Sequence, residues 1–295
     1  MKRKEKVFEI IFLLVACISI VAVAMICIFL FANGIPAMGK IGLGKFLGGQ
    51  VWKPGNDKYG IFPMIIGSIY VTAGAIIFGV PIGILTSVFM AMYCPKKIYR
   101  PLKAATELLA GIPSVVYGFF GMVIVVPIIR DFGRTLKMMG LVEKSGDGKG
   151  ILTTSIVLGM MILPTIIGTT ESAMRAVPPQ YYEGSLALGA TQERSIFKVV
   201  IPAAKSGVIT GIVLGIGRAI GEAMAITLVA GSAVNVPLPF NSVRFLTTAI
   251  VSEMAYSADT HRRVLFTIGL VLFVFIMIIN LVLNRMMKKG EKADG

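Results

Sequence analysis

Two ionisable side chains, Arg218 and Glu222, interrupt a long apolar segment of the sequence. They are four residues apart, which places both on one face of a helix. A charge near the middle of a membrane span costs about 2.5–3.5 kcal/mol of insertion free energy. Such a residue is therefore paired with another charge, hydrated, or required for function. The planar guanidinium group of Arg218 suits an oxyanion such as phosphate. Two compatible interpretations follow: a structural Arg–Glu pair, or an anion pathway in which Glu222 holds Arg218 while the path is empty.

A second candidate is the charged segment Glu183–Pro202, EGSLALGATQERSIFKVVIP, which lies between two long apolar runs. It is too polar for the hydrocarbon region, so we expect it outside the bilayer as a short amphipathic helix. We predict that this helix binds a partner in the cytoplasm.

Small residues recur at every fourth position in the apolar segment that contains Arg218, at Gly207, Gly211 and Gly215. This spacing lets the backbone of another helix approach closely. The three glycines therefore predict a packed helix interface, and the partner helix belongs either to this chain or to a second one.

The sequence carries no pattern that predicts an enzyme. Residues 34–40 have the spacing of a phosphate-binding loop, but Ile41 replaces the Ser or Thr that would hold magnesium. His261 is the only histidine, and we expect it at the solvated surface rather than in a metal site. We therefore expect no catalytic residue, metal or cofactor in this chain.

The apolar residues come in blocks and make up 56% of the 295 residues, if aromatic residues and cysteine are included. About 20 apolar residues cross about 30 Å of hydrocarbon. Six windows are long enough, roughly 7–33, 61–93, 104–130, 151–173, 204–230 and 264–284. We predict an all-α integral membrane protein with six transmembrane helices. Residues 61–285 form its main domain, with a first helix and outer loop at 1–60 and a tail at 286–295.

The net charge of +14 comes from residues at the ends of these windows rather than from one patch, which argues against nucleic-acid binding. Lys and Arg are denser in the loops on the side of both termini, so we expect both termini in the cytoplasm. Glu171 is expected at a cytoplasmic helix end, at the interface or paired with the basic loops. The loop 231–263 contains SVRFLTTAIVSEMA, which is expected to form a short re-entrant or interfacial helix on the outer face.

The segment Glu183–Pro202 resembles the coupling motif of type I ABC importer permeases. Glu183, Gly189 and Pro202 match that motif at the right spacing, whereas Gly184 and Ser185 replace its two alanines. The resemblance implies the MetI-like permease fold. It also implies that this segment docks on a cytoplasmic ATP-binding subunit, with residues 178–202 as the coupling segment. The residues assigned to coupling are Glu183, Gly189, Phe197 and Pro202.

Other stretches are similar to permeases of the bacterial phosphate importer, namely ELLAGIPSVVYG (107–118), RAIGEA (218–223) and the outer-loop residues 51–63 and 235–254. This resemblance covers roughly residues 47–285. It implies a plasma-membrane complex of two homologous permeases, two ATP-binding subunits that hold ATP–Mg, and an external phosphate-binding protein. It also implies that Arg218 and Glu222 serve phosphate passage. The alternatives are another oxyanion such as sulfate or molybdate, or a self-sufficient channel or membrane sensor.

Overall fold

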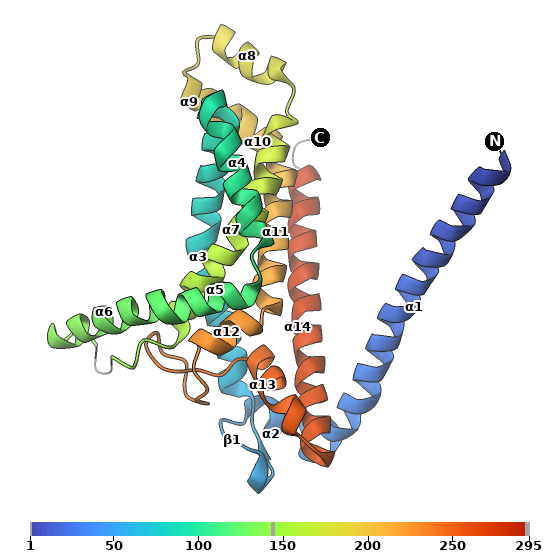
Figure 1. The fold of residues 1–295 in the computed structure, drawn as a ribbon, viewed down its shortest axis with the longest axis vertical. Coiled ribbons are helices and arrows are strands. Elements are labelled where there is room, and N and C mark those ends of the chain that lie inside the picture. The colour runs from blue at the N-terminus through green and yellow to red at the C-terminus, as the bar shows by residue number, and fades with distance from the viewer. Residues whose placement is uncertain (1, 143–144, 293–295) are drawn as a thin grey trace.

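The computed structural model describes residues 2–142 and 145–292, which are mostly helical (Figure 1). The longer helices are α1 (Lys2–Ile41), α3 (Phe62–Val88), α4 (Lys96–Gly111), α6 (Val126–Met138), α7 (Ile151–Arg175), α11 (Lys205–Gly221) and α14 (Asp259–Lys292). The shorter helices are α2 (Leu43–Gly48), α5 (Ser114–Phe120), α8 (Pro179–Ala187), α9 (Gln192–Ser195), α10 (Ile201–Ala203), α12 (Met224–Val229) and α13 (Leu246–Glu253).

Short irregular elements connect these helices. Stretches of π-helix at Phe89–Tyr93, Gly121–Val125 and Ile196–Val200 extend α3, join α5 to α6 and join α9 to α10. Turns of 3₁₀ helix lie at Pro54–Asn56 and Met254–Tyr256. The strands β1 (Trp52–Lys53) and β2 (Lys58–Tyr59) form an antiparallel hairpin in which Trp52 pairs with Tyr59.

The centre of the bundle is the packing of α3 against α7. Glycines permit this close approach. A Cβ atom on Gly79 would lie 2.7 Å from Ile162 and one on Gly83 would lie 2.7 Å from Ile166, which is too close for a side chain at either position. Leu158, Ile162 and Ile166 are completely buried in the same cluster. Burial of apolar surface between these two helices thus forms the core on which the other elements are placed.

The bundle has two distinct ends (Figure 1). The end that carries α8 and α9 is called the docking end, and the end that carries the hairpin and α2 is called the hairpin end. The helix α1 begins, and α14 finishes, toward the docking end. The short helix predicted within 231–263 is α13, which lies toward the hairpin end and buries residues 246–249.

The number of membrane-spanning helices agrees with the six that the sequence predicts, if one bent pair of helices counts as one span. Five described helices are long and apolar enough to cross a membrane: 6–41, 62–93, 114–138, 151–175 and 259–282. The pair Gln192–Ala203 and Lys205–Gly221, bent by 71°, makes a sixth if it is one span. The predicted all-α, six-span class is confirmed.

Three boundaries differ from the prediction. The window 104–130 is not one helix, because α4 ends at Gly111 and Pro113 separates it from α5. The window 204–230 is also broken, since α11 ends at Gly221. The first loop is shorter than predicted, because α1 continues to Ile41 and α2 follows it.

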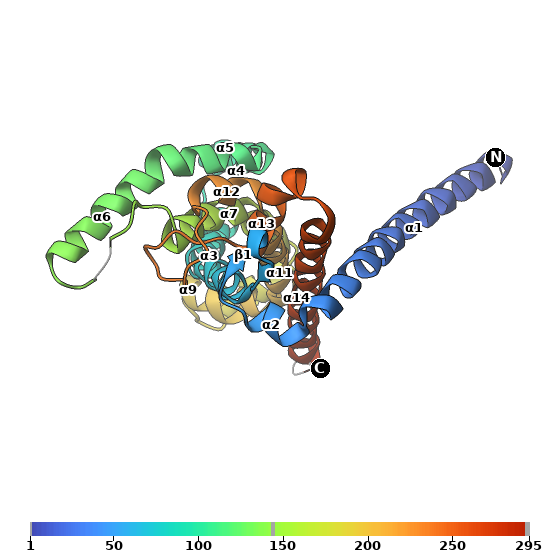
Figure 2. The same ribbon diagram turned by 90° about the horizontal axis from the view of Figure 1, so that it is seen from below.

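The helix α1 stands apart from the bundle along most of its length (Figures 1 and 2). It meets α14 only near the hairpin end, where the rings of Phe29 and Phe266 lie 5.2 Å apart and Thr267 Oγ1 donates to the Gly34 carbonyl at 2.9 Å. No residue from 6 to 33 is buried within the chain. The apolar surface of α1 is therefore free to face lipid or a partner.

Candidate functional site

The segment that carries Arg218 and Glu222 is a broken helix. Arg218 lies in the last turn of α11, whereas Glu222 has extended backbone angles, φ −70° and ψ 136°. The prediction that both residues share one helical face is therefore wrong. Glu222 Oε1 instead accepts a hydrogen bond from the Ala225 main-chain nitrogen at 3.0 Å, which satisfies a free donor at the start of α12.

Arg218 is half-buried and has no acidic partner among the described residues. The structure therefore does not contain the Arg218–Glu222 ion pair that the structural interpretation predicted. A guanidinium group at a discontinuous membrane helix, without a carboxylate bound to it, is an arrangement suited to receiving an anion.

A sharp corner between α4 and α5 lies beside this break. The Tyr117 hydroxyl donates to the Leu109 carbonyl at 2.8 Å and so joins the two sides of the corner. Gly118 of α5 packs on α12 so closely that a Cβ atom there would lie 2.8 Å from Ala225 Cα. The helices α5 and α12, which are far apart in the sequence, thus lie side by side (Figure 1).

The predicted coupling segment projects from the docking end (Figure 1). Gly189 ends α8 with φ +85°, a left-handed conformation that favours glycine. The Thr191 hydroxyl oxygen accepts a hydrogen bond from the main-chain nitrogen of Arg194 at 3.3 Å and so caps the start of α9. Ser195 and Ile196 are completely buried, and the latter packs in a cluster with residues of α3, α7 and α11. The segment is therefore held firmly at its base.

The coupling segment, residues 178–202, exposes several apolar side chains. Leu188 is 91% exposed and Tyr181 is 56% exposed, and Leu186 and Phe197 of the same segment are also exposed. Glu183 and Pro202 lie on the exposed surface of the same segment. Exposed apolar groups of this kind mark interaction sites. The sequence argument singled out Phe197 but missed Leu188 and Tyr181, which could have been found as apolar residues in a polar segment.

The three glycines of α11 lie against α7 of the same chain. A Cβ atom on Gly207 would collide with the side chain of Ala173, and one on Gly211 would lie 3.2 Å from Thr170. One on Gly215 would lie 3.1 Å from Ile166. The structure thus places this glycine face within the chain rather than toward a second one.

Sequence reasoning did not foresee a cluster around Glu171 at the docking end. This carboxylate is 1% exposed and accepts hydrogen bonds from Tyr99, Lys103 and Arg175. The bond to Glu171 raises the pKa of Lys103, so the ammonium group stays charged at neutral pH. Pairing with basic residues agrees with the sequence, although Lys103 and Arg175 lie in helices rather than in loops. The convergence of three donors has no sequence signal.

A similar cluster lies at the hairpin end around Glu253. It binds the indole of Trp52 at 3.1 Å, the guanidinium group of Arg244, and His261 at 2.8 Å. His261 is therefore held in a polar cluster, and the prediction that it is simply solvated is wrong. The cluster ties the hairpin to α13 and α14.

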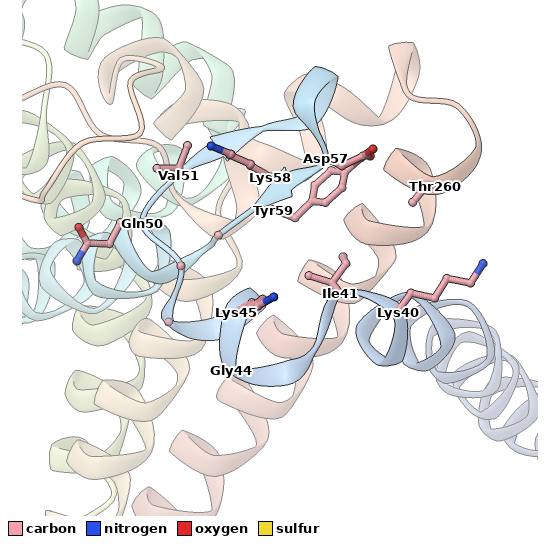
Figure 3. A pocket seen from close by; sticks show the side chains of 13 residues that line it. Lys40, Ile41, Gly44, Lys45, Gln50, Val51, Asp57, Lys58, Tyr59 and Thr260 are labelled. Carbon is pink, nitrogen blue, oxygen red and sulfur yellow. The ribbon is translucent and has the colours of Figure 1, made fainter.

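A hollow of about 870 Å³ also lies at the hairpin end, lined by three lysines, Lys40, Lys45 and Lys58 (Figure 3). The side chains of Lys40 and Lys58 point away from each other. Because an oxyanion site needs donors that converge, this hollow does not compete with Arg218 as a candidate. No group of acidic, His or Cys residues in the described part of the chain could hold a metal ion.

Comparison with known proteins identifies the fold and family. Residues 79–292 match the family described as binding-protein-dependent transport system inner membrane component. The chain belongs to this family. It is an ABC importer permease, and a multi-pass membrane protein rather than an enzyme.

Relatives within the family cover nearly the whole chain. The probable ABC transporter permease YqgH of Bacillus subtilis is 38% identical over 92% of this chain and 88% of that protein. The phosphate transport permease PstC of Mesorhizobium japonicum is 32% identical over 95% of this chain and 89% of that protein.

Two solved structures share the fold. A bacterial alginate ABC importer has a TM-score of 0.62 at 14% identity, covering 94% of this chain and 95% of that one. The MetNI methionine transporter has a TM-score of 0.59 at 18% identity, covering 81% of this chain and 99% of that one. These likenesses confirm the MetI-like permease fold.

Proposed function

We propose that this protein is the permease subunit of an ATP-driven ABC importer that moves inorganic phosphate into the cell. Relatives named as phosphate transport permeases support the substrate. The observation that carries the proposal is Arg218, a half-buried cation at a helix break with no carboxylate bound to it in the described part of the chain. A phosphate ion would supply the missing negative charge, and the guanidinium fork matches two of its oxygens.

Arg218 and Glu222 are assigned to the substrate pathway in different roles. Arg218 receives the anion. Glu222 stabilises the interruption between α11 and α12, because its hydrogen bond to Ala225 caps the new helix directly after α11 ends. Discontinuous helices of this kind form substrate sites near the middle of the membrane in other transporters.

The coupling of transport to ATP is assigned to the coupling segment, residues 178–202, which is called the docking segment from here on; its coupling residues are Glu183, Gly189, Phe197 and Pro202. The exposed apolar side chains of that segment support its assignment as a partner surface. The partners are two ATP-binding subunits that hold ATP–Mg, a second homologous permease and an external phosphate-binding protein. This chain carries no cofactor itself.

The docking end is placed in the cytoplasm of a bacterial cell, because the loops on that side hold more Lys and Arg. Both termini then face inward across the plasma membrane. The mechanism is alternating access: the binding protein delivers phosphate at the hairpin end, closure of the ATP-binding subunits moves the docking segment, and the bundle rocks around Arg218.

Uptake of radioactive phosphate by a deletion strain that expresses this chain tests the substrate. We expect a large excess of sulfate or molybdate to leave the uptake unchanged. Rescue of sulfate uptake would assign the chain to another oxyanion. Flux through the chain reconstituted without ATP-binding subunits would instead identify a channel.

A further inference from the structure

The carboxylate of Glu171 is buried at the docking end, in the last turns of α7. It accepts from the Tyr99 hydroxyl at 2.6 Å, from Lys103 Nζ at 2.8 Å and from Arg175 Nε at 2.7 Å. Taking a carboxylate out of water costs several kcal/mol unless charges and hydrogen bonds compensate it. The burial of Glu171 therefore depends on these three donors. We call these four residues the Glu171 cluster.

The donors of the Glu171 cluster come from different elements. Tyr99 and Lys103 belong to α4, whereas Arg175 belongs to α7. Arg175 also donates to the Met90 carbonyl at 2.8 Å, in the π-helical stretch that extends α3. Its guanidinium group lies 4.3 Å from the centre of the Tyr99 ring, which adds a cation–π contact. One buried charge thus joins α3, α4 and α7.

The attachment of α4 to the bundle depends strongly on this cluster. No residue of α4 is buried, so packing of apolar side chains contributes little to holding the helix. The bonds from Tyr99 and Lys103 to Glu171 are charge-assisted and are the stronger kind of hydrogen bond. We expect α4 to follow α7 as long as these bonds are intact.

The Glu171 cluster lies between the docking segment and the candidate anion site. At one side, α7 ends at Arg175 and only residues 176–178 separate it from α8. At the other side, α4 leads to the corner where the Tyr117 hydroxyl donates to the Leu109 carbonyl, and Gly118 of the same corner packs on α12, which follows the helix break after Arg218. A movement of α8 reaches the corner by this route if α7 and α4 move together.

We propose that the Glu171 cluster is the mechanical link that transmits movement of the docking segment to the α4–α5 corner beside Arg218. This inference rests on the proposed function. Tyr99, Lys103 and Glu171 are then positioning residues, because they act on the anion path through α4 and do not touch the anion. Such a claim requires a demonstration that both sites bias the same element.

The double substitution Tyr99→Phe with Lys103→Met tests the link in the assembled importer. Glu171 keeps its bond to Arg175, so the buried charge retains a cation while α4 is released. In proteoliposomes we expect ATP-binding subunits to remain bound, and phosphate moved per ATP hydrolysed to fall about tenfold or more, within the usual range of coupling between sites. An unchanged ratio would overturn the link.

A distance measurement tests the same link without regard to the transported anion. Spin labels on Gly184→Cys in α8 and Val116→Cys in α5, both exposed, report their separation after the native cysteines are replaced. We expect ATP to shift this distance in the parent complex and not in the double variant. An equal shift in both would refute the proposal, whether the complex carries phosphate or sulfate.

Two further variants guard against a merely structural effect. Tyr99→Phe removes a single oxygen atom, and we expect a smaller loss of phosphate moved per ATP in a stable complex; no loss would count against the link. Asp131→Asn is the matched control, because Asp131 is an exposed acid paired with arginines of its own helix. We expect the control to transport as the parent complex does, and an equal loss there would also contradict the proposal.

Discussion

Glu222 accepts a hydrogen bond from the main-chain nitrogen of Ala225 at 3.0 Å, and so begins α12 instead of pairing with Arg218. The two charged residues that the sequence suggests as a pair do not form an ion pair in the described part of the chain. Arg218 completes the last turn of α11, where the negative end of the helix dipole favours a cation. Because no carboxylate in the described part of the chain pairs with Arg218, its guanidinium group keeps its bonding capacity for an arriving anion.

Substitution of Glu222 distinguishes a cap from a charge partner. Glu222→Gln keeps an oxygen that accepts from Ala225, so we expect most of the phosphate uptake to remain. Glu222→Ala removes the cap, which costs about 0.5–2 kcal/mol of helix stability, and we expect clearly lower uptake. Initial rates at equal amounts of complex provide the measurement. Equal, severe losses in both variants would return Glu222 to the role of a partner for Arg218.

The left-handed turn of the docking segment predicts the effect of Gly189→Asp. A side chain at φ +85° costs about 1–2 kcal/mol, so we expect the turn to open and the ATP-binding subunit to dissociate or hydrolyse ATP without transport. Co-purification of that subunit is the measurement. Gly184→Asp adds the same charge to α8, where a Cβ atom has open space, and serves as the control. Equal dissociation in both would show that charge, not the turn, is responsible.

Leu188 is 91% exposed within the chain and is expected to be a main contact of the ATP-binding subunit. Leu188→Ser removes a large apolar side chain, so we expect weaker association by about 1–3 kcal/mol and unchanged stability of the permease. Titration of the ATP-binding subunit onto the permease measures this. Leu141→Ser, at an exposed leucine outside the docking segment, should have no effect. Normal binding by the Leu188 variant would remove it from the interface.

The contact of α11 with α7 predicts opposite results for two glycines of α11. Gly207→Ala would force a methyl group into Ala173, and overpacking typically destabilises by about 1–3 kcal/mol. Gly217→Ala meets open space and replaces a flexible residue inside a helix, so we expect it to be neutral or stabilising by about 0.5–1 kcal/mol. Thermal unfolding in detergent compares the two. Equal stabilities would contradict this close packing.

Much of the architecture could be predicted from the sequence, because a membrane span requires a long apolar run and each of the six runs is present. The breaks could not be located so well. Residues 204–230 read as one apolar helix, yet the chain leaves helical geometry at Glu222, whose side chain bonds to Ala225. An i, i+4 spacing predicts a shared face only when the helix is continuous.

The polar clusters escaped prediction for a different reason. The partners of Glu171 come from α4 and α7, and those of Glu253 come from β1, α14 and the stretch before α13. Sequence alone shows each residue as an isolated charge or ring near a helix end. Only the packing of α3, α4 and α7, and of the hairpin on α13 and α14, brings these donors to one carboxylate.

The most direct test of the account is phosphate transport by Arg218 variants in the fully assembled importer. We expect Arg218→Ala to assemble normally with the ATP-binding subunits and to lose phosphate uptake, and Arg218→Lys to retain only part of it, because a lysine keeps the charge but not the two-pronged fork. Near-normal uptake by Arg218→Ala in a complex of normal composition would contradict the assignment of this residue to the anion path.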